Sequence, residues 1–225
     1  MAKLFRVVDF EITAITHYDS LNLKKYCKKI FVVKDYSLKT LEKIFLETDP
    51  YQKKSFLLGS GFAENHKRSK IFNNRKNYGN DFKVNCFVKN KEFFKKLKKN
   101  KILFPKLIKK NSLKQTLIKN LKSFGSQNVK KLENKNYNLK KNEYFQELID
   151  GKRISVQFIS KIRQLRIISV CDQVLKKKTF FIDYLITKRL SKKKQNQIYT
   201  LVKKIVKLFN LKGINNIDII DKKNK

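Results

Sequence analysis

Two short runs of glycine and serine are the parts of this sequence best suited to bind an anion. The first is Gly-Ser-Gly at 59–61, and the second contains Ser123, Gly125 and Ser126; each follows an apolar stretch of the kind that forms strands. Backbone N–H groups and hydroxyls in such a turn can coordinate phosphate oxygens. An ordinary tight turn has the same composition, so both runs are compatible with a phosphate site and with a plain turn.

Histidine and cysteine offer little chemistry here. The two histidines are far apart, and the three cysteines, Cys27, Cys86 and Cys171, form no Cys-x-x-Cys pair. This pattern argues against a disulfide framework and against a zinc site. No apolar run approaches the ~20 residues of a membrane span, and the first residues lack the layout of a signal peptide. We therefore expect a cytoplasmic protein that does not act in a membrane.

The formal net charge of +37 suggests a nucleic-acid partner. However, only seven of the 55 basic residues are arginine, the side chain whose planar fork suits phosphates and guanine edges. The lysines are spread along the chain, and Lys, Asn, Ile, Phe and Tyr are all encoded by A/T-rich codons. Most of the lysines therefore fit a solvated surface, and nucleic-acid binding stays an alternative.

The first 80 residues predict a small parallel α/β unit, because strand and helix patterns alternate. Strands are predicted at 3–10, 29–34 and 55–62, with a short helix at 20–28 and a second helix that begins after Ser37. The Gly-Ser-Gly run lies at the carboxyl end of the third strand, where sheets of this kind bind ligands.

The remaining sequence predicts antiparallel strands with two helices. The helices are expected at 91–100 and from Ser191 to Asn210, and the second carries one apolar face. The expected strands, in chain order, are 84–88, 102–104, 116–119, 129–132, 166–170, 179–186 and 213–221.

The segment 144–160, YFQELIDGKRISVQFIS, is the most informative part of the chain. Asp150-Gly151 marks a turn between two strands, and after it Ile154, Val156 and Phe158 alternate with polar residues. The alternation puts three large side chains on one face, which an ordinary half-buried hairpin would also do.

The order Gln-x-Leu-Ile-Asp-Gly followed by an Ile-Ser-Val strand resembles the hinge of the ATP-grasp family. The resemblance implies that the backbones of Glu147, Leu148 and Ile149 line the adenine edge of ATP. It places Gln146 where relatives carry an acidic side chain near the adenine amino group, and an amide can pair with adenine equally well. Where relatives offer a carboxylate to the ribose, this sequence has Lys152 and Arg153, so ribose recognition departs from the pattern and Glu147 or Asp150 is left as a substitute.

The same resemblance implies roles at the phosphate end of the nucleotide. Lys119 matches the lysine that ends a strand, and Lys91 is the best match for a second lysine near a helix start. Ser123, Gly125 and Ser126 match the loop that closes over the β- and γ-phosphates, although this loop has only one glycine.

Asp218, in the strand at 213–221, matches a magnesium-binding carboxylate. Relatives complete two metal sites with a following Glu-x-Asn strand, and this sequence ends at Lys225 before such a strand. The resemblance therefore implies a chain that is truncated within its active site, or a degenerate member.

We thus expect a pre-ATP-grasp α/β domain over residues 1–82 and an incomplete ATP-grasp domain over 83–225. The implied function is that of a ligase that uses ATP and Mg²⁺ to activate an unidentified carboxylate as an acyl phosphate for attack by a nucleophile. Two alternatives stay open: a basic nucleic-acid-binding accessory protein, whose affinity would fall steeply with salt, and a catalytically inactive ATP-grasp relic.

Overall fold

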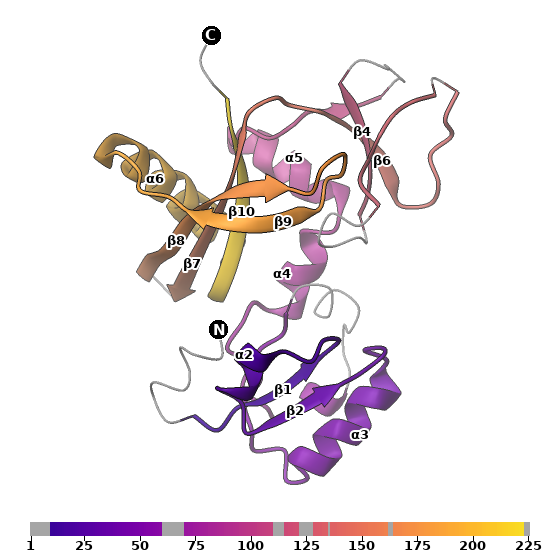
Figure 1. Cartoon of the computed structure of the whole chain (residues 1–225), viewed down its shortest axis with the longest axis vertical. Helices are drawn as coiled ribbons and strands as arrows, with labels where there is room; N and C mark the ends of the chain where they lie inside the picture. The colour runs from indigo at the N-terminus through magenta and orange to yellow at the C-terminus, as the bar shows by residue number, and fades with distance from the viewer. Residues whose placement is uncertain are drawn as a thin grey trace. The chain divides into compact units, whose positions relative to one another are not determined.

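A computed structural model describes residues 10–59, 70–109, 115–121, 128–134, 136–161 and 164–222 of the chain. The chain divides into two compact units, one formed by residues 1–55 with 68–76 and the other by 56–67 with 77–225 (Figure 1). The predicted fold class, a small parallel unit followed by antiparallel sheets, is confirmed. The predicted domain boundary between residues 82 and 83 stays a prediction.

The first unit contains a two-stranded parallel sheet of β1 (Thr13–Thr16) and β2 (Lys29–Val32). Helices α2 (Leu21–Lys24) and α3 (Leu38–Thr48) and the 3-10 helix η1 (Lys70–Phe72) complete it. Ser37 caps α3 as predicted, because its side chain accepts a hydrogen bond from the N–H of Thr40. The sequence did not predict β1, and the strand expected at 3–10 lies almost wholly outside the described residues.

A buried ion pair fixes the end of the first unit. Arg75 Nε donates to Asp49 Oδ2 at 2.8 Å and its Nη2 to the carbonyl of Asp49 at 2.9 Å. Asp49 also accepts from the N–H groups of Lys53 and Lys54. Because the carboxylate and guanidinium satisfy each other, both charges can be buried.

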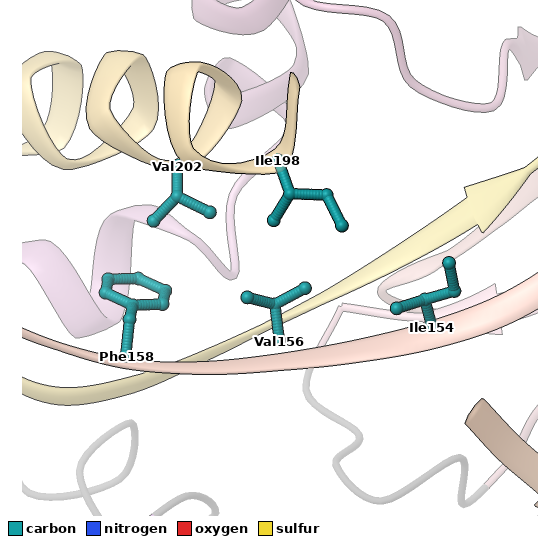
Figure 2. Packing of buried hydrophobic residues seen from close by; sticks show 5 residues of the cluster. All are labelled: Ile154, Val156, Phe158, Ile198 and Val202. Carbon is teal, nitrogen blue, oxygen red and sulfur yellow. The ribbon is translucent and has the colours of Figure 1, made fainter. Parts of the chain in front are cut away.

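The second unit is organised around a four-stranded antiparallel sheet in the order β10-β7-β8-β9. Its strands are β7 (Lys152–Lys161), β8 (Gln164–Leu175), β9 (Ile182–Thr187) and β10 (Gly213–Asp221). Helix α6 (Lys192–Phe209) covers one face, and Figure 2 shows its Ile198 and Val202 above three side chains of β7. Those three are the predicted inward residues Ile154, Val156 and Phe158, all fully buried.

A smaller antiparallel sheet has the order β3-β6-β4-β5. Its strands are β3 (Leu107–Ile108), β6 (Glu143–Glu147), β4 (Thr116–Asn120) and β5 (Lys130–Lys131). Ile118, Leu132 and Phe145 form the core on one of its faces. Helix α5 (Lys91–Lys99) begins at the predicted position, with Asn90 as its N-cap.

Two predicted strands are wrong. Residues 84–88, expected as a strand, lie largely in α4 (Phe82–Phe87), because the carboxylate of Asp81 accepts from the N–H of Lys83 and caps a helix. Residues 102–104 form no strand: Ile102 is buried, whereas Leu103 is almost fully exposed. The strand expected at 55–62 is reduced, within residues 55–59, to one parallel bridge between Phe56 and Asn77.

The start of β10 is clamped to the segment before α4. Asn80 Nδ2 donates to Asn215 Oδ1 at 2.6 Å, and Asn80 Oδ1 accepts from the N–H of Lys212 at 2.8 Å. Gly213 has a φ of +71°, and a Cβ there would lie 2.2 Å from the carbonyl oxygen of Tyr78. Only glycine therefore permits this close approach of two backbone segments.

Candidate functional site

The face of the large sheet opposite α6 carries polar side chains from three strands. Because side chains alternate along β7, Arg153 and Ser155 point away from the core that Ile154 and Val156 form. The strand register places Ser155 opposite Asp218 of β10 on one side and opposite Cys171 of β8 on the other. Residues distant in sequence thus meet on one surface.

Asp218 is the centre of a hydrogen-bond network on this face. Its Oδ1 accepts from Gln173 Nε2 at 2.6 Å and from Asn216 Nδ2 at 2.9 Å. The buried hydroxyl of Ser155 lies 2.8 Å from Asn216 Oδ1 and 3.3 Å from Asp218 Oδ1. The hydroxyl can therefore donate its one proton to either oxygen. All these donors use Oδ1, and Oδ2 accepts no hydrogen bond from the part of the chain that the structure describes.

Two cations lie close enough to this carboxylate for their pKa values to respond to it. Burial lowers the pKa of Lys119, the charge of Arg153 lowers it further, and Asp218 partly offsets both effects. Burial also lowers the pKa of Arg153, again opposed by Asp218. The Arg153 guanidinium lies over the ring of Phe180, 5.3 Å from its centroid. Two positive groups around one carboxylate leave a net positive charge, which suits a polyanion such as a phosphate chain.

Lys119 belongs to the small sheet, on the face opposite its core. The register pairs Lys119 with Tyr144 and Leu117 with Gln146, so these four side chains share one face of β4 and β6. Tyr144 packs against Phe94 of α5 with ring centroids 5.7 Å apart, and burial raises its pKa to about 12. The face that carries the cation therefore also carries a half-buried aromatic ring.

Gln146 is buried, and its amide orientation is fixed by one contact. Nε2 donates to the carbonyl oxygen of Pro105 at 3.1 Å. A carbonyl oxygen can only accept, so the amide must turn its nitrogen toward Pro105 and its oxygen away. Gln146 thus keeps an acceptor for another partner.

Some of the backbone groups that follow Gln146 are already hydrogen-bonded within the small sheet. The N–H of Glu147 donates to the carbonyl of Lys106 at 2.9 Å, and that of Leu148 donates to the carbonyl of Gln115 at 2.6 Å. The N–H of Lys106 turns instead to Glu147 Oε2 at 3.3 Å. Within the described ranges, no hydrogen bond uses the carbonyl of Glu147 or the N–H of Ile149. These groups are an acceptor and a donor two residues apart.

The other predicted site residues are placed as follows. Lys91 is the first residue of α5 and is exposed. Ser123, Gly125 and Ser126 lie outside the described residues. The structure therefore brings together Lys119 and Asp218 through their electrostatic interaction, and places Gln146 on the same face as Lys119.

The sequence analysis missed four residues of the polar network: Arg153 as a partner of Asp218, Ser155, Gln173 and Asn216. Gln173 follows Asp172 and precedes Val174 and Leu175 in β8, and its polar side chain beside this apolar end of the strand is the one local signal that points to it. Ser155 and Asn216 looked like the outward residues of ordinary alternating strands. Their importance follows from the register of β7 with β8 and β10, which no local pattern encodes.

The donor set can be tested against Mg²⁺. Among the described residues, no group of three or more His, Cys, Asp or Glu side chains is placed to hold a metal ion. Mg²⁺ is commonly bound through one or two carboxylates together with substrate phosphates and water. The exposed carboxylate of Asp218, with Oδ2 free of the network, fits one Mg²⁺ shared with a bound phosphate chain.

The fold and the site together define an α/β protein whose two antiparallel sheets contribute a hinge, two cations and a carboxylate. A family model described as an ATP-grasp domain (ATP-grasp_3) matches residues 88–225. This chain belongs to the ATP-grasp family. No curated protein matches the sequence significantly.

Solved structures of ATP-grasp enzymes have the same fold. The N5-carboxyaminoimidazole ribonucleotide synthetase of Thermotoga maritima gives a TM-score of 0.66 at 14% identity, covering 98% of this chain and 61% of the synthetase. The biotin carboxylase domain of 2-oxoglutarate carboxylase from Hydrogenobacter thermophilus, solved with MgADP and bicarbonate, gives 0.71 at 15% identity, covering 97% and 57%. The D-alanine–D-alanine ligase of Bacillus anthracis, solved with ATP, gives 0.58 at 11% identity, covering 93% and 82%.

The chain spans less than two thirds of the synthetase and of the biotin carboxylase domain. At these identities the likeness shows the fold alone. No helix among the described residues is long and apolar enough to cross a membrane.

Proposed function

We propose that this chain binds Mg²⁺–ATP between the hinge at 146–149 and the Asp218 network, and that it serves a ligase that activates a carboxylate. The single observation that carries the proposal is the meeting of Lys119, Arg153 and Asp218 in a chain of the ATP-grasp family. Both cations share the charge of Asp218, and neither forms a direct ion pair with a carboxylate of the described residues. A nucleotide phosphate chain would supply the missing negative charge.

At the adenine end, the hinge offers complementary groups. The carbonyl of Glu147 would accept from the adenine amino group, and the N–H of Ile149 would donate to a ring nitrogen. The free oxygen of Gln146 would accept a second hydrogen bond from the same amino group. The N–H of Leu148 is already bonded within the sheet, so its role is to fix the hinge.

At the phosphate end, Lys119 and Arg153 would neutralise the charge of the transferring phosphoryl group. Lys91 and the loop with Ser123, Gly125 and Ser126 would add further donors, as the family resemblance implies. Asp218 would hold Mg²⁺, which when bound supplies additional charge neutralisation. Gln173 and Asn216 would keep the carboxylate oriented by their hydrogen bonds to Oδ1.

In the proposed reaction, a substrate carboxylate oxygen attacks the γ-phosphorus of ATP, and ADP leaves with the electron pair of the broken P–O bond. The resulting acyl phosphate is then attacked at its carbonyl carbon by an amine or another nucleophile. Inorganic phosphate leaves, and the nucleophile loses a proton. No pocket among the described residues specifies the carboxylate or the nucleophile.

Calorimetric titration with ATP and excess Mg²⁺ tests the nucleotide site. The Lys119→Ala variant should lose at least about tenfold in affinity, because a charge-assisted contact to phosphate contributes roughly 1.5–3 kcal/mol. Lys207→Ala is the matched control, since Lys207 is an exposed lysine on α6 and the helix covers the other face of the sheet. Its affinity should stay within about twofold of the wild type.

Unchanged ATP affinity in Lys119→Ala, with native circular dichroism, would show that the site assignment is wrong. Removing a half-buried cation should not unfold the protein, because its charge is disfavoured by burial. A loss of binding with a retained fold would therefore report on the site.

A further inference from the structure

Strand β9 forms an apolar edge of the large sheet. Among the strands of the described residues it pairs with β8 alone, and all six of its residues are exposed. Five large apolar side chains in and just before β9 are between 42% and 54% exposed: Phe181, Ile182, Tyr184, Leu185 and Ile186. Tyr184 and Ile186 lie on one face of the strand and Leu185 on the other, so both faces are apolar.

Such an edge is unusual for a protein that stays in solution by itself. Edge strands are normally protected by charged residues, proline, bulges or a covering segment. Within β9, Asp183 is the one charged residue and lies at a register shift, so the stretch from Tyr184 to Thr187 carries neither a charge nor a bulge. A contiguous apolar edge of this kind marks a surface that another chain covers.

The hydrogen-bonding groups available on this edge follow from the register. The N–H of Lys188 donates to the carbonyl of Val170, next to the pair Cys171–Thr187. Bonding alternates along an antiparallel pair, so Ile186 and Tyr184 also direct their backbone groups to β8. Leu185 and Thr187 direct theirs outward, where an added strand would meet them, whereas Asp183 lies at the register shift opposite Val174 and Leu175, where the alternation is broken.

The charges at both ends of β9 are positive. Lys176, Lys177 and Lys178 are exposed in the turn before it, and Arg189 is exposed after it. None of these four forms an ion pair with a carboxylate of the described residues, whereas Lys188 is bound to Asp172. In antiparallel pairing with a second copy, the lysine end of one β9 would face the Arg189 end of the other. Like charges would then oppose each other at both ends, in two molecules that each carry +37.

We propose that β9 binds an extended segment of a partner protein that has an apolar centre and acidic ends. The segment would add a fifth strand to the sheet through the outward backbone groups of Leu185 and Thr187. Its side chains would cover Tyr184 and Leu185, and its acidic ends would meet Lys176–Lys178 and Arg189. This interaction does not depend on nucleotide binding.

A pair of synthetic peptides tests the charge preference. Both have the centre Val-Thr-Val-Tyr-Val and a fluorescent label; one is flanked by three glutamates on each side and the other by three lysines. Fluorescence anisotropy with the full chain should show saturable binding of the glutamate peptide, at least about tenfold tighter than that of the lysine peptide. The binding should weaken as salt is raised, because the end contacts are exposed ion pairs.

Two variants test the position of the site. Leu185→Pro removes an outward N–H and leaves the hydrogen bonds to β8 intact, so it should abolish peptide binding with the fold retained. Leu185→Ala keeps that N–H and should weaken binding much less. Replacing Lys176, Lys177 and Lys178 together with serine should weaken binding of the glutamate peptide without touching the strand.

Three results would overturn the proposal. The first is equal or absent binding of the two peptides. The second is unchanged binding in Leu185→Pro. The third is a wild-type protein that sediments as a dimer and becomes a monomer in Leu185→Pro, since a second copy would then cover the edge.

Discussion

The two faces of β7 show how one strand serves two purposes. Ile154, Val156 and Phe158 are fully buried beneath α6, where Ile198 and Val202 meet them (Figure 2). On the opposite face, Arg153 and Ser155 belong to a polar network around an exposed carboxylate. The first face is closed by packing within the chain, whereas the second keeps charges and an acceptor open to a ligand.

The two faces of β7 should therefore contribute to different properties, the buried face to stability and the polar face to ligand binding. Burial of large apolar side chains stabilises a fold by several kcal/mol per residue. Exposed hydrogen bonds and ion pairs contribute little to stability, but they can bind charged ligands. Substitutions on the two faces should therefore separate the two properties.

The largest effect is expected on the α6 side of β7. Phe158→Ala should lower the free energy of unfolding by about 3–5 kcal/mol, because it leaves a cavity in a fully buried core. Urea denaturation measures the change. Gln157→Ala, the exposed neighbour on the opposite face, is the control and should change stability by less than about 0.5 kcal/mol. Similar losses in both variants would contradict the division between the faces.

A smaller effect, visible through pH, is expected on the small sheet. Burial raises the pKa of Tyr144 from 10 to about 12, so between these pH values the native state keeps a proton that the unfolded chain releases. Stability from this group is complete below pH 10 and is lost as pH rises toward 12. Relative to Tyr144→Phe, the wild type should lose about 2 kcal/mol of unfolding free energy over that window.

Denaturation of both proteins at a series of pH values measures this difference. It should stay constant from pH 7 to 9, where the phenol is protonated in both states. A difference that is flat up to pH 12 would show that the phenol of Tyr144 is open to water and that the Lys119 face of the small sheet is not enclosed.

The smallest effect on stability is expected at Asp218. Asp218→Asn keeps an oxygen for Gln173 and Asn216 and removes one exposed charge, so stability should change by less than about 1 kcal/mol. The Mg²⁺-dependent part of ATP affinity should nevertheless be lost, as titrations with and without Mg²⁺ would show. Glu133→Gln, an exposed carboxylate on another part of the chain, is the control and should keep it. A Mg²⁺ effect that survives in Asp218→Asn would remove the carboxylate from the proposed site.

Local features of the sequence predicted much of this fold. The helix caps Ser37 and Ser191, the alternating strand at 154–158 and the apolar face of α6 are all as expected, because each depends on residues within one or two turns. The family resemblance, carried by the hinge at 146–151, was also confirmed. Each of these signals lies within a short stretch of sequence.

The network around Asp218 could not be predicted in the same way. Gln173 and Asp218 are 45 residues apart, and Ser155 and Asp218 are 63 apart. Their contact depends on the registers of β7 with β8 and with β10, and a bulge after Gln157 changes the first of these. A one-residue change of register would turn the side chains to the other face, so a local pattern cannot fix such a contact. The misassigned segment at 84–88 has a simpler cause, since Asp81 favoured a helix start that the apolar residues obscured.

The clamp between Asn80 and the start of β10 has a consequence for how the protein folds. Its hydrogen bond joins residues 135 positions apart, so it closes a very long loop. Such contacts are expected to form late, because closing a long loop costs conformational entropy before the contact contributes any stabilisation. Asp218 is three residues beyond Asn215, and it reaches Ser155 and Gln173 only once β10 has docked. We therefore expect the carboxylate to be assembled late in folding, and the proposed ATP site to form only after the apolar core.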